Sequence, residues 1–342
     1  MVSWQYRDSI GAATDLIPLF HVVLTHCQLR SDECLMVYAD YHSPPHIAAA
    51  FIAAAQQLGS DAFQITVPTQ QPDILDGAVW DAWHKVDMVI DLESITTSVY
   101  RPLRVSALAS GTRVLRVTEP EDVLFRMPPD PVVRDRAKRS EALVDEAAEF
   151  RITSEAGTDI VVNVDGLKSY GLWGVADKPG MWDHWPMGLV VVPANRKGTN
   201  GRIVVDVGDI LLSMQHYVGT PITVTVEEGI VTSVEGELDA ALLRQWFEKW
   251  KDNRAYEISH VGWGCEHRAD WNRLARKIPG GTSDAESFYG DLQIAFGRDT
   301  SPLLGGRNDV AAHIDFDCLN VSIDLDGRAI IKNGAFVIEE LK

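Results

Sequence analysis

The order of apolar and helical stretches along residues 35–117 is the feature that most constrains the fold of this chain. Short apolar runs typical of buried strands alternate with stretches of helical spacing. The runs expected as strands are 35–39, 63–67, 86–90 and 113–117, and the clearest helical stretch is 47–58. Because strands that alternate with helices usually pair in parallel, this order predicts βαβ units around a mainly parallel sheet.

Proline-rich residues 127–131 interrupt this pattern, and a charged helix is expected over 132–150. Strands dominate from there onward. The segments expected as strands are 159–164, 189–192 and 202–207, with a hairpin over 222–234 and tight turns at Asp326-Gly327 and Asn333-Gly334. One helix, expected over 238–251, carries a stripe of Leu, Trp and Phe typical of packing. The sequence therefore predicts an α/β domain over residues 1–147 and a β-rich α+β domain over residues 148–342.

Charge and hydropathy narrow the range of partners. The 342 residues include 31 basic and 49 acidic ones, which gives a net charge of −18 that repels phosphate backbones and anionic membrane surfaces. The first residues lack a basic segment followed by an apolar core, and no later apolar run approaches membrane-spanning length. We therefore expect a cytoplasmic protein that binds neither nucleic acid nor membranes.

The cysteines predict neither a disulfide framework nor a zinc knuckle. There are four in the chain, Cys27, Cys34, Cys265 and Cys318, and no two are spaced as CxxC. Cys318 lies three residues beyond Asp315, and this odd offset turns it to the other face of a continuous strand. Cys265 follows His260 by five residues, but a packed thiol is the more common role of such a residue. We expect buried free thiols.

The segment His313-Ile314-Asp315 predicts half of a metal site. Alternate residues of a strand point the same way, so an imidazole is presented beside a carboxylate. His260, just before a Gly-x-Gly turn, offers a second imidazole, and the three residues together would form a two-His-one-carboxylate face that suits ferrous iron. The plainer interpretation stays open: His313 and Asp315 can bond to each other or to the backbone, and His260 can be a satisfied core histidine.

A third cluster lies in residues 176–186, which are expected to form a loop. Two tryptophans, an aspartate and a histidine occupy the four consecutive positions Trp182, Asp183, His184 and Trp185. In a functional interpretation, Asp183 orients or charge-stabilises His184, which exchanges a proton while the indole faces hold a planar aromatic substrate. In a structural one, the tryptophans fill a domain interface. A loop bounded by Pro and Gly with a titratable centre favours the first.

Several common signatures are absent from the sequence. No Gly-x-Gly-x-x-Gly follows a strand, and no Gly-Lys-Ser or Gly-Lys-Thr loop is present, so nucleotide phosphate binding has no support. A Gly-x-Ser-x-Gly elbow is also absent, which removes the usual sign of a serine nucleophile in an α/β hydrolase.

Four motifs, taken in this order, resemble the bacterial 2,5-dihydroxypyridine 5,6-dioxygenases. They are residues 182–186, 258–264, 288–290 and 313–315, and residues 118–124 and 205–210 extend the resemblance over most of the chain. The resemblance implies a distant relationship to the M29 metallo-aminopeptidases, and hence an M29 aminopeptidase-like fold.

The resemblance also implies an activity, a cofactor and a set of site residues. The activity is cleavage of a hydroxylated N-heteroaromatic ring, such as that of 2,5-dihydroxypyridine, by O2. The cofactor is Fe(2+), which unlike redox-inert zinc supplies electrons to O2. The implied metal ligands are His260, His313 and Asp315; the implied catalytic residues are His184, Asp183 and Tyr100; the implied substrate-binding residues are Trp182, Trp185 and Tyr289. The resemblance further suggests a homo-oligomer.

Two departures from the dioxygenase pattern bear on the substrate. The resemblance leads us to expect an acid/base histidine in the first domain, but this chain has no histidine between His84 and His184, and Tyr100 falls nearest to that position. A glutamate expected before the tryptophan loop is replaced by Leu172. Tyrosine donates a proton but is a weak base near neutral pH. The sequence therefore favours a different hydroxypyridine or a related substituted ring as the substrate.

Two other functions stay open. A metallo-aminopeptidase of the M29 type would hold two metals through additional carboxylates and a further histidine, whereas this chain has His260, Arg202 and Gln293 near those positions. Arginine cannot ligate a cation and repels one. A non-catalytic binding protein would explain a packed tryptophan loop, but not three potential metal ligands.

Overall fold

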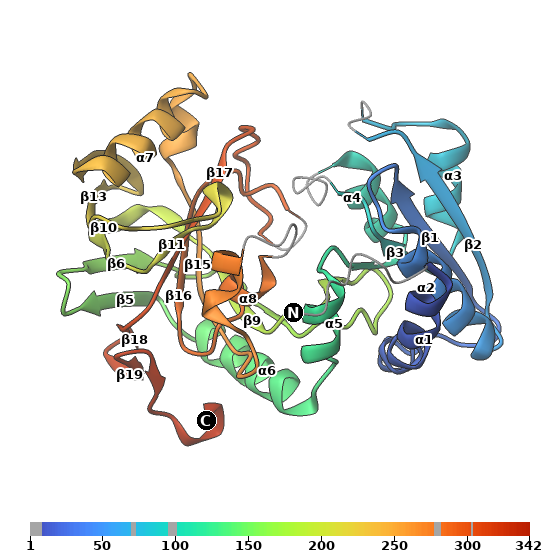
Figure 1. Cartoon of the computed structure of the whole chain (residues 1–342). Helices are drawn as coiled ribbons and strands as arrows, with labels where there is room; N and C mark the ends of the chain where they lie inside the picture. Colours follow the sequence, from blue (N-terminus) through green and yellow to red (C-terminus); the bar gives the residue numbers. More distant parts are fainter. Residues whose placement is uncertain (1–8, 70–72, 95–100, 277–281, 302–303) are drawn as a thin grey trace. The chain divides into compact units, whose positions relative to one another are not determined.

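The computed structural model of the chain describes residues 9–69, 73–94, 101–276, 282–301 and 304–342, and these form two compact units (Figure 1). The first unit contains the residues up to Pro129 together with the segment Trp173–Pro186. The second contains Asp130–Leu172 and Met187–Lys342. Within the part of the chain that is described, no helix has the length and apolar character needed to span a membrane.

A five-stranded parallel sheet organises the first unit, with the strand order β2-β1-β3-β4-β8. Its strands are β1 (Cys34–Asp40), β2 (Asp61–Val67), β3 (Met88–Asp91), β4 (Arg113–Arg116) and β8 (Trp182–His184). Its helices are α1 (Ser9–His26), α2 (Pro45–Gln57), α3 (Gly77–Lys85), α4 (Pro102–Ala109) and α5 (Glu121–Arg126). Helix α1 packs on α2, and α3 packs on α4. With the right-handed crossovers usual between parallel strands, the strand order β2-β1-β3-β4 puts the two pairs on opposite faces of the sheet. The predicted α/β architecture is confirmed.

Two antiparallel sheets form the second unit. One has the order β14-β13-β10-β6-β5-β18-β19-β20 and the other the order β12-β11-β17-β16-β15-β9-β7. The strands of the first of these sheets are β5 (Glu149–Ser154), β6 (Asp159–Asn163), β10 (Asn195–Val205), β13 (Ile222–Glu227), β14 (Ile230–Gly236), β18 (Val321–Leu325), β19 (Arg328–Lys332) and β20 (Ala335–Phe336). The strands of the other are β7 (Tyr170–Leu172), β9 (Leu189–Pro193), β11 (Ile210–Leu211), β12 (His216–Tyr217), β15 (Ile258–Gly264), β16 (Leu292–Gly297) and β17 (His313–Cys318).

The core of the second unit lies between these two sheets. Trp263 of β15 is fully buried and packs against Phe150 of β5, with ring centroids 5.5 Å apart. Helix α6 (Pro131–Asp145) packs on β7 and β9, and α7 (Leu238–Glu248) packs on β13 and β14, while α8 (Ser283–Glu286) is a single short turn. The tryptophan stripe of α7 is a packing face, as the sequence predicted, since Trp246 and Phe247 are buried. The β-rich second domain and the two predicted tight turns are present.

The division of the chain differs from the predicted boundary near residue 148. Helix α6 ends at Asp145, residues Glu149–Ser154 form a strand, and both belong to the second unit because α6 packs on that unit's sheet. The expected loop around Trp182 contains the short strand β8, which pairs in parallel with β4 of the first unit. The chain therefore returns to the first unit after it has begun the second.

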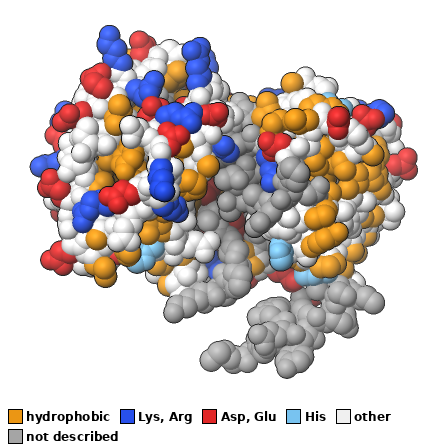
Figure 2. Space-filling view, turned by 90° about the horizontal axis from the view of Figure 1, so that it is seen from above, with side chains coloured by type: hydrophobic (Ala, Val, Ile, Leu, Met, Phe, Trp, Pro, Cys, Tyr) orange, Lys and Arg blue, Asp and Glu red, His pale blue; other side chains and the backbone are white. Residues whose placement is uncertain are grey.

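Acidic and basic side chains are interspersed on the face drawn in Figure 2, so the net charge of −18 is not gathered there into one acidic patch.

Of the four cysteines, Cys27, Cys265 and Cys318 are buried and all four are free, as expected. Burial raises the pKa of both Cys27 and Cys265 to about 12, which keeps them as uncharged thiols.

Gly262 allows β15 to approach β9 closely. A Cβ atom at this position would lie 2.0 Å from the carbonyl oxygen of Val190, which belongs to the backbone and cannot swing away. We expect Gly262→Ala to destabilise the protein by about 2–4 kcal/mol because the pairing of the two strands must shift. Thermal unfolding followed by circular dichroism measures this. Gly219→Ala is the matched control, since its added Cβ would meet Asp239 only at 3.7 Å; an equal effect of the two changes would contradict the prediction.

Candidate metal centre

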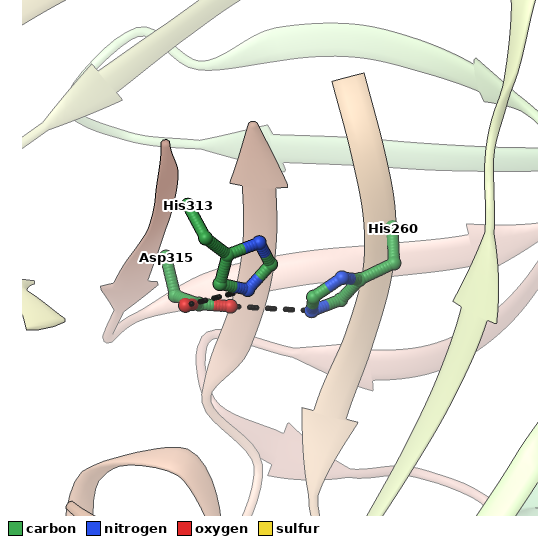
Figure 3. A group of neighbouring side chains, drawn as sticks. All are labelled: His260, His313 and Asp315. Carbon is green, nitrogen blue, oxygen red and sulfur yellow. Dashed lines mark ion pairs between the residues drawn. The ribbon is translucent and has the colours of Figure 1, made fainter. Parts of the chain in front are cut away.

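Two strands that flank β16 carry the three predicted ligands (Figure 3). His260 lies on β15, and His313 and Asp315 lie on β17. Ala295 of the intervening β16 is paired with Asp315, and its small side chain leaves room for the imidazole and the carboxylate to meet across the middle strand. The pairing of β15 with β16 shifts register between Ile258 and Val261. Such a bulge re-aims side chains, and here the interval includes Ser259 and His260.

The three side chains converge as the sequence predicted. Nε2 of His260 lies 3.2 Å from Oδ1 of Asp315, and Nε2 of His313 lies 3.3 Å from Oδ2 of the same carboxylate. One ligand atom from each residue lies within 4.8 Å of the other two. Among the described residues this is the one such group of three or more His, Cys, Asp or Glu side chains. Two imidazoles and one carboxylate are a donor set that first-row divalent metals accept.

The surroundings of Asp315 and His260 favour the protonation states that bind a cation, a charged carboxylate and a neutral imidazole. Burial by itself raises the pKa of Asp315, but the adjacent His313 and His260 hold it well below its usual range. Burial lowers the pKa of His260, which favours the neutral, ligating imidazole. Burial of the ring lowers the pKa of His313, but the charge of Asp315 and the hydrogen bonds to Asp315 and to the carbonyl of Arg298 together raise it above its usual value. A divalent ion would replace the proton that His313 and Asp315 otherwise share.

His184 lies in the first unit, on β8, whereas the three converging residues lie in the second. Its Nε2 atom is 3.3 Å from the hydroxyl of Thr118. The strand register places Asp91, Arg116 and His184 side by side on β3, β4 and β8. Burial, and then the charge of Arg116, lower the pKa of His184 to about 3, so its imidazole is uncharged near neutral pH.

The buried charges beside His184 were not anticipated from the sequence. Arg104 forms bonds of 2.7 Å and 2.9 Å to the carboxylate of Asp91 and one of 2.6 Å to Glu93, and Arg116 adds a 3.3 Å contact to Asp91. All four side chains are buried. The sequence did contain a sign of this network, since charged residues interrupt the apolar runs that become β3 and β4. Charged side chains in such runs are buried only when they are paired with an opposite charge.

Asp183 does not orient the imidazole of His184 as predicted. Successive residues of a strand point to opposite faces, so the carboxylate of Asp183 turns away from the ring. It accepts the backbone N–H groups of Trp173, Val175 and His184 at 3.2, 3.0 and 2.7 Å. Burial raises its pKa to about 7 in spite of these donors. Asp183 therefore holds the segment Trp173–Pro186 together, and its catalytic role stays a prediction.

We expect Asp183→Ala to lower the free energy of unfolding by about 3 kcal/mol or more, because three buried N–H groups lose their acceptor. Thermal or urea unfolding of the purified protein checks this. The matched control is Asp177→Ala in the same segment, where the aspartate is only half-buried. If both changes shift the midpoint equally, Asp183 is not the organising residue of the segment.

The remaining predicted residues divide between the two units. Trp182 lies beside His184, with ring centroids 6.4 Å apart, and its Nε1 has no partner among the described residues. Trp185 is instead a core residue of the first unit: it is 1% exposed, donates from Nε1 to the carbonyl of Met127 and packs edge-on against Phe20. The predicted role of Trp185 in a pocket wall stays a prediction. Tyr100 lies outside the described residues.

Tyr289 also has a structural role where substrate binding was predicted. Its hydroxyl donates to the carbonyl of Leu341 at 3.2 Å, its ring packs on Phe336, and the guanidinium of Arg136 lies 4.6 Å from the ring centroid. Arg136 donates to the same carbonyl at 2.8 Å. Both side chains therefore anchor the C-terminal segment, a contact between distant residues that local sequence does not reveal.

Arg202 and Gln293 lie on different sheets. They are the residues found near the positions where a two-metal aminopeptidase would have further ligands. Arg202 is exposed on β10 and donates to the carbonyl of Gly157 at 2.8 Å, so it is not part of the group around Asp315. Gln293 is buried on β16 and donates to the carbonyl of Glu286. Its amide is therefore engaged with the backbone.

Comparison with known proteins agrees with this geometry. The family model described as NicX, 2,5-dihydroxypyridine 5,6-dioxygenase, matches residues 15–338. The 2,5-dihydroxypyridine 5,6-dioxygenase of Pseudomonas putida KT2440 is 29% identical over 343 aligned positions, which cover 95% of this chain and 97% of that protein.

Two solved structures share the fold. The 2,5-dihydroxypyridine dioxygenase of Pseudomonas putida KT2440 has a TM-score of 0.90 at 29% identity and covers 96% of this chain and 99% of its own. Wild-type AmpT from Thermus thermophilus has a TM-score of 0.60 at 13% identity, covering 95% of this chain and 99% of its own, which is a likeness of fold alone. Both the predicted resemblance and the M29 aminopeptidase-like fold are confirmed.

Proposed function

Since the chain belongs to the 2,5-dihydroxypyridine 5,6-dioxygenase family, whose model matches residues 15–338, we propose that it is a metal-dependent dioxygenase that opens a hydroxylated N-heteroaromatic ring. The observation that carries the proposal is the convergence of His260, His313 and Asp315. We take 2,5-dihydroxypyridine as the first substrate to test. Its ring would open between C5 and C6, with both atoms of O2 incorporated, to give N-formylmaleamate in aromatic catabolism.

We propose ferrous iron as the metal. His260, His313 and Asp315 would hold it on one face and leave positions open on the other, and it would supply the electrons that O2 needs to react with a closed-shell ring. The protein's part is to hold one imidazole nitrogen of His260, one of His313 and the carboxylate of Asp315 in place. The buried, low-pKa carboxylate of Asp315 balances part of the charge of the ion.

His184 and Trp182 are the proposed substrate-handling residues of the first unit. The uncharged imidazole of His184 has a lone pair that would accept a hydrogen bond from a ring hydroxyl. Because a pKa of about 3 makes it a weak base, His184 would take the proton only if a bound metal also lowered the pKa of that hydroxyl. Trp182 offers an indole face and an N–H group without a partner among the described residues, which suits contact with a polar aromatic ring. Tyr100 remains a proposed proton donor in place of the histidine expected there.

A metallo-aminopeptidase is the weaker candidate. A two-metal site requires additional carboxylate or imidazole ligands near the three that converge, and no larger group of this kind occurs among the described residues. The likeness to AmpT at 13% identity supports a shared fold and nothing further. The proposal also includes a cytoplasmic location and a homo-oligomeric state, both of which the family resemblance suggests.

The experiment that tests the proposed function is O2 uptake by protein loaded anaerobically with Fe(2+) and offered 2,5-dihydroxypyridine, with ring absorbance followed in parallel. We expect one O2 consumed per ring opened. Zinc-loaded protein is the matched control, since zinc cannot reduce O2. Peptide hydrolysis by the zinc form without O2 uptake by the iron form would favour the aminopeptidase. Uptake only with another hydroxylated pyridine would keep the reaction and change the substrate.

A further inference from the structure

The nitrogen atoms of the two histidines that face away from Asp315 are held by one hydrogen-bonded chain. Nδ1 of His313 lies 2.9 Å from the carbonyl oxygen of Arg298. A carbonyl oxygen only accepts, so Nδ1 of His313 carries the proton. The proton that His313 shares with Asp315 then lies on Nε2, and Nε2 is the nitrogen that would bind a metal once this proton has left.

His260 reaches the same carbonyl through a serine. The hydroxyl of Ser259 lies 2.9 Å from the carbonyl oxygen of Arg298 and 3.1 Å from Nδ1 of His260. A hydroxyl has one proton to give, and the carbonyl can only accept it, so the serine oxygen accepts from Nδ1–H of His260. Nε2 of His260 is thereby left as the lone-pair atom that faces Asp315.

The shared carbonyl is itself fixed in position. The backbone N–H of Arg298 donates to Ala312 at 2.8 Å, next to His313 in the chain. The guanidinium of Arg298 donates to the carbonyls of Val310 and Asp309, both at 2.9 Å. Arg298 therefore ties the segment before His313 to the end of β16. Ser259 is buried, 1% exposed, so water does not readily replace its hydroxyl.

We propose that Ser259 and the carbonyl of Arg298 form one tautomer-setting unit, which orients both imidazoles so that the metal binds through their Nε2 atoms. Ser259 is in this sense a positioning residue for His260. Without its hydroxyl, His260 can carry its proton on Nε2 and donate it to Asp315 3.2 Å away, and that bond competes with the metal. The inference rests on the metal site of the proposed function but not on the reaction.

The test compares Ser259→Ala with the parent protein in two measurements. The first is the dissociation constant for Co2+, read from its visible absorption without substrate or O2. Loss of such an outer partner weakens metal binding about 10–100-fold, and we expect a change in that range. Ser259→Thr, which keeps the hydroxyl, should restore tight binding. Ser213→Ala is the matched control, because the Ser213 hydroxyl donates to the backbone carbonyl of His313 at 2.7 Å rather than to an imidazole nitrogen.

The second measurement is the nitrogen NMR spectrum of histidine-labelled, metal-free protein at alkaline pH, which reports the tautomer directly. We expect the Nδ1–H form at both His260 and His313 in the parent, and its loss at His260 alone in Ser259→Ala. An Nε2–H form in the parent, or unchanged Co2+ affinity and tautomer in Ser259→Ala, would overturn the inference. Failure of the iron-loaded parent to consume O2 would count against the proposed function only.

Discussion

His313→Ala protein is expected to lose both its bound metal and its turnover. His313 supplies one of three ligand atoms that lie within 4.8 Å of one another, and an alanine leaves one imidazole and one carboxylate, too few donors to hold a divalent ion tightly. We expect iron content near zero after desalting and turnover below about one thousandth of the parent value. Metal analysis together with O2 uptake measures both quantities.

The matched control for this change is His267→Ala. His267 belongs to the same unit, is 44% exposed and lies 3.8 Å from the carboxylate of Glu266, outside the metal centre. It should keep iron and turnover. A His313→Ala protein that is folded by circular dichroism and still binds one iron per chain would mean that the three residues are not the metal site.

Replacement of His184 should separate metal binding from chemistry. His184 lies on β8 in the first unit, so His184→Ala is expected to keep a full complement of iron. If His184 accepts the proton of the ring hydroxyl, turnover should fall by about 10²–10⁴-fold, the usual contribution of a general base. Steady-state O2 uptake and metal analysis on the same sample check the two parts. His42→Ala, an exposed histidine of the same unit, is the control. Full turnover in iron-loaded His184→Ala would remove the residue from the mechanism.

The same substitution should alter the pH dependence of stability. Burial holds the pKa of His184 at about 3 in the folded protein, whereas an unfolded histidine titrates near 6.5. Between these values the unfolded chain binds more protons, so the imidazole makes the free energy of unfolding rise with pH across that window. This part of the rise should be missing from unfolding midpoints of His184→Ala measured at a series of pH values.

Local patterns predicted the elements and the metal centre well. The alternation of side chains along a strand was enough to pair His313 with Asp315, and residue chemistry was enough to add His260. The route by which they meet could not be predicted, because it depends on the insertion of β16 between β15 and β17 and on a register shift between Ile258 and Val261. Both are contacts between segments distant in sequence.

The cluster around Trp182 shows where such patterns fail. Three residues are too few for periodicity to identify a strand. The residues around Trp182 also do not indicate that β8 pairs with β4, because β4 is formed by the distant residues Arg113–Arg116. Once that pairing is known, the opposite orientations of Asp183 and His184 follow from strand geometry. The anchoring of Leu341 by Tyr289 was hidden for the same reason.

The return of the chain to its first sheet has a consequence for synthesis on the ribosome. Strand β4 is complete at Arg116, but its outer edge is covered only when Trp182–His184 has been made. Until then the nascent chain presents unpaired backbone N–H and C=O groups along a strand that is buried in the finished protein, the kind of edge that joins to other chains. The first unit therefore finishes folding only after translation has passed well into the second, and a fragment cut at the apparent domain boundary would keep that edge open permanently.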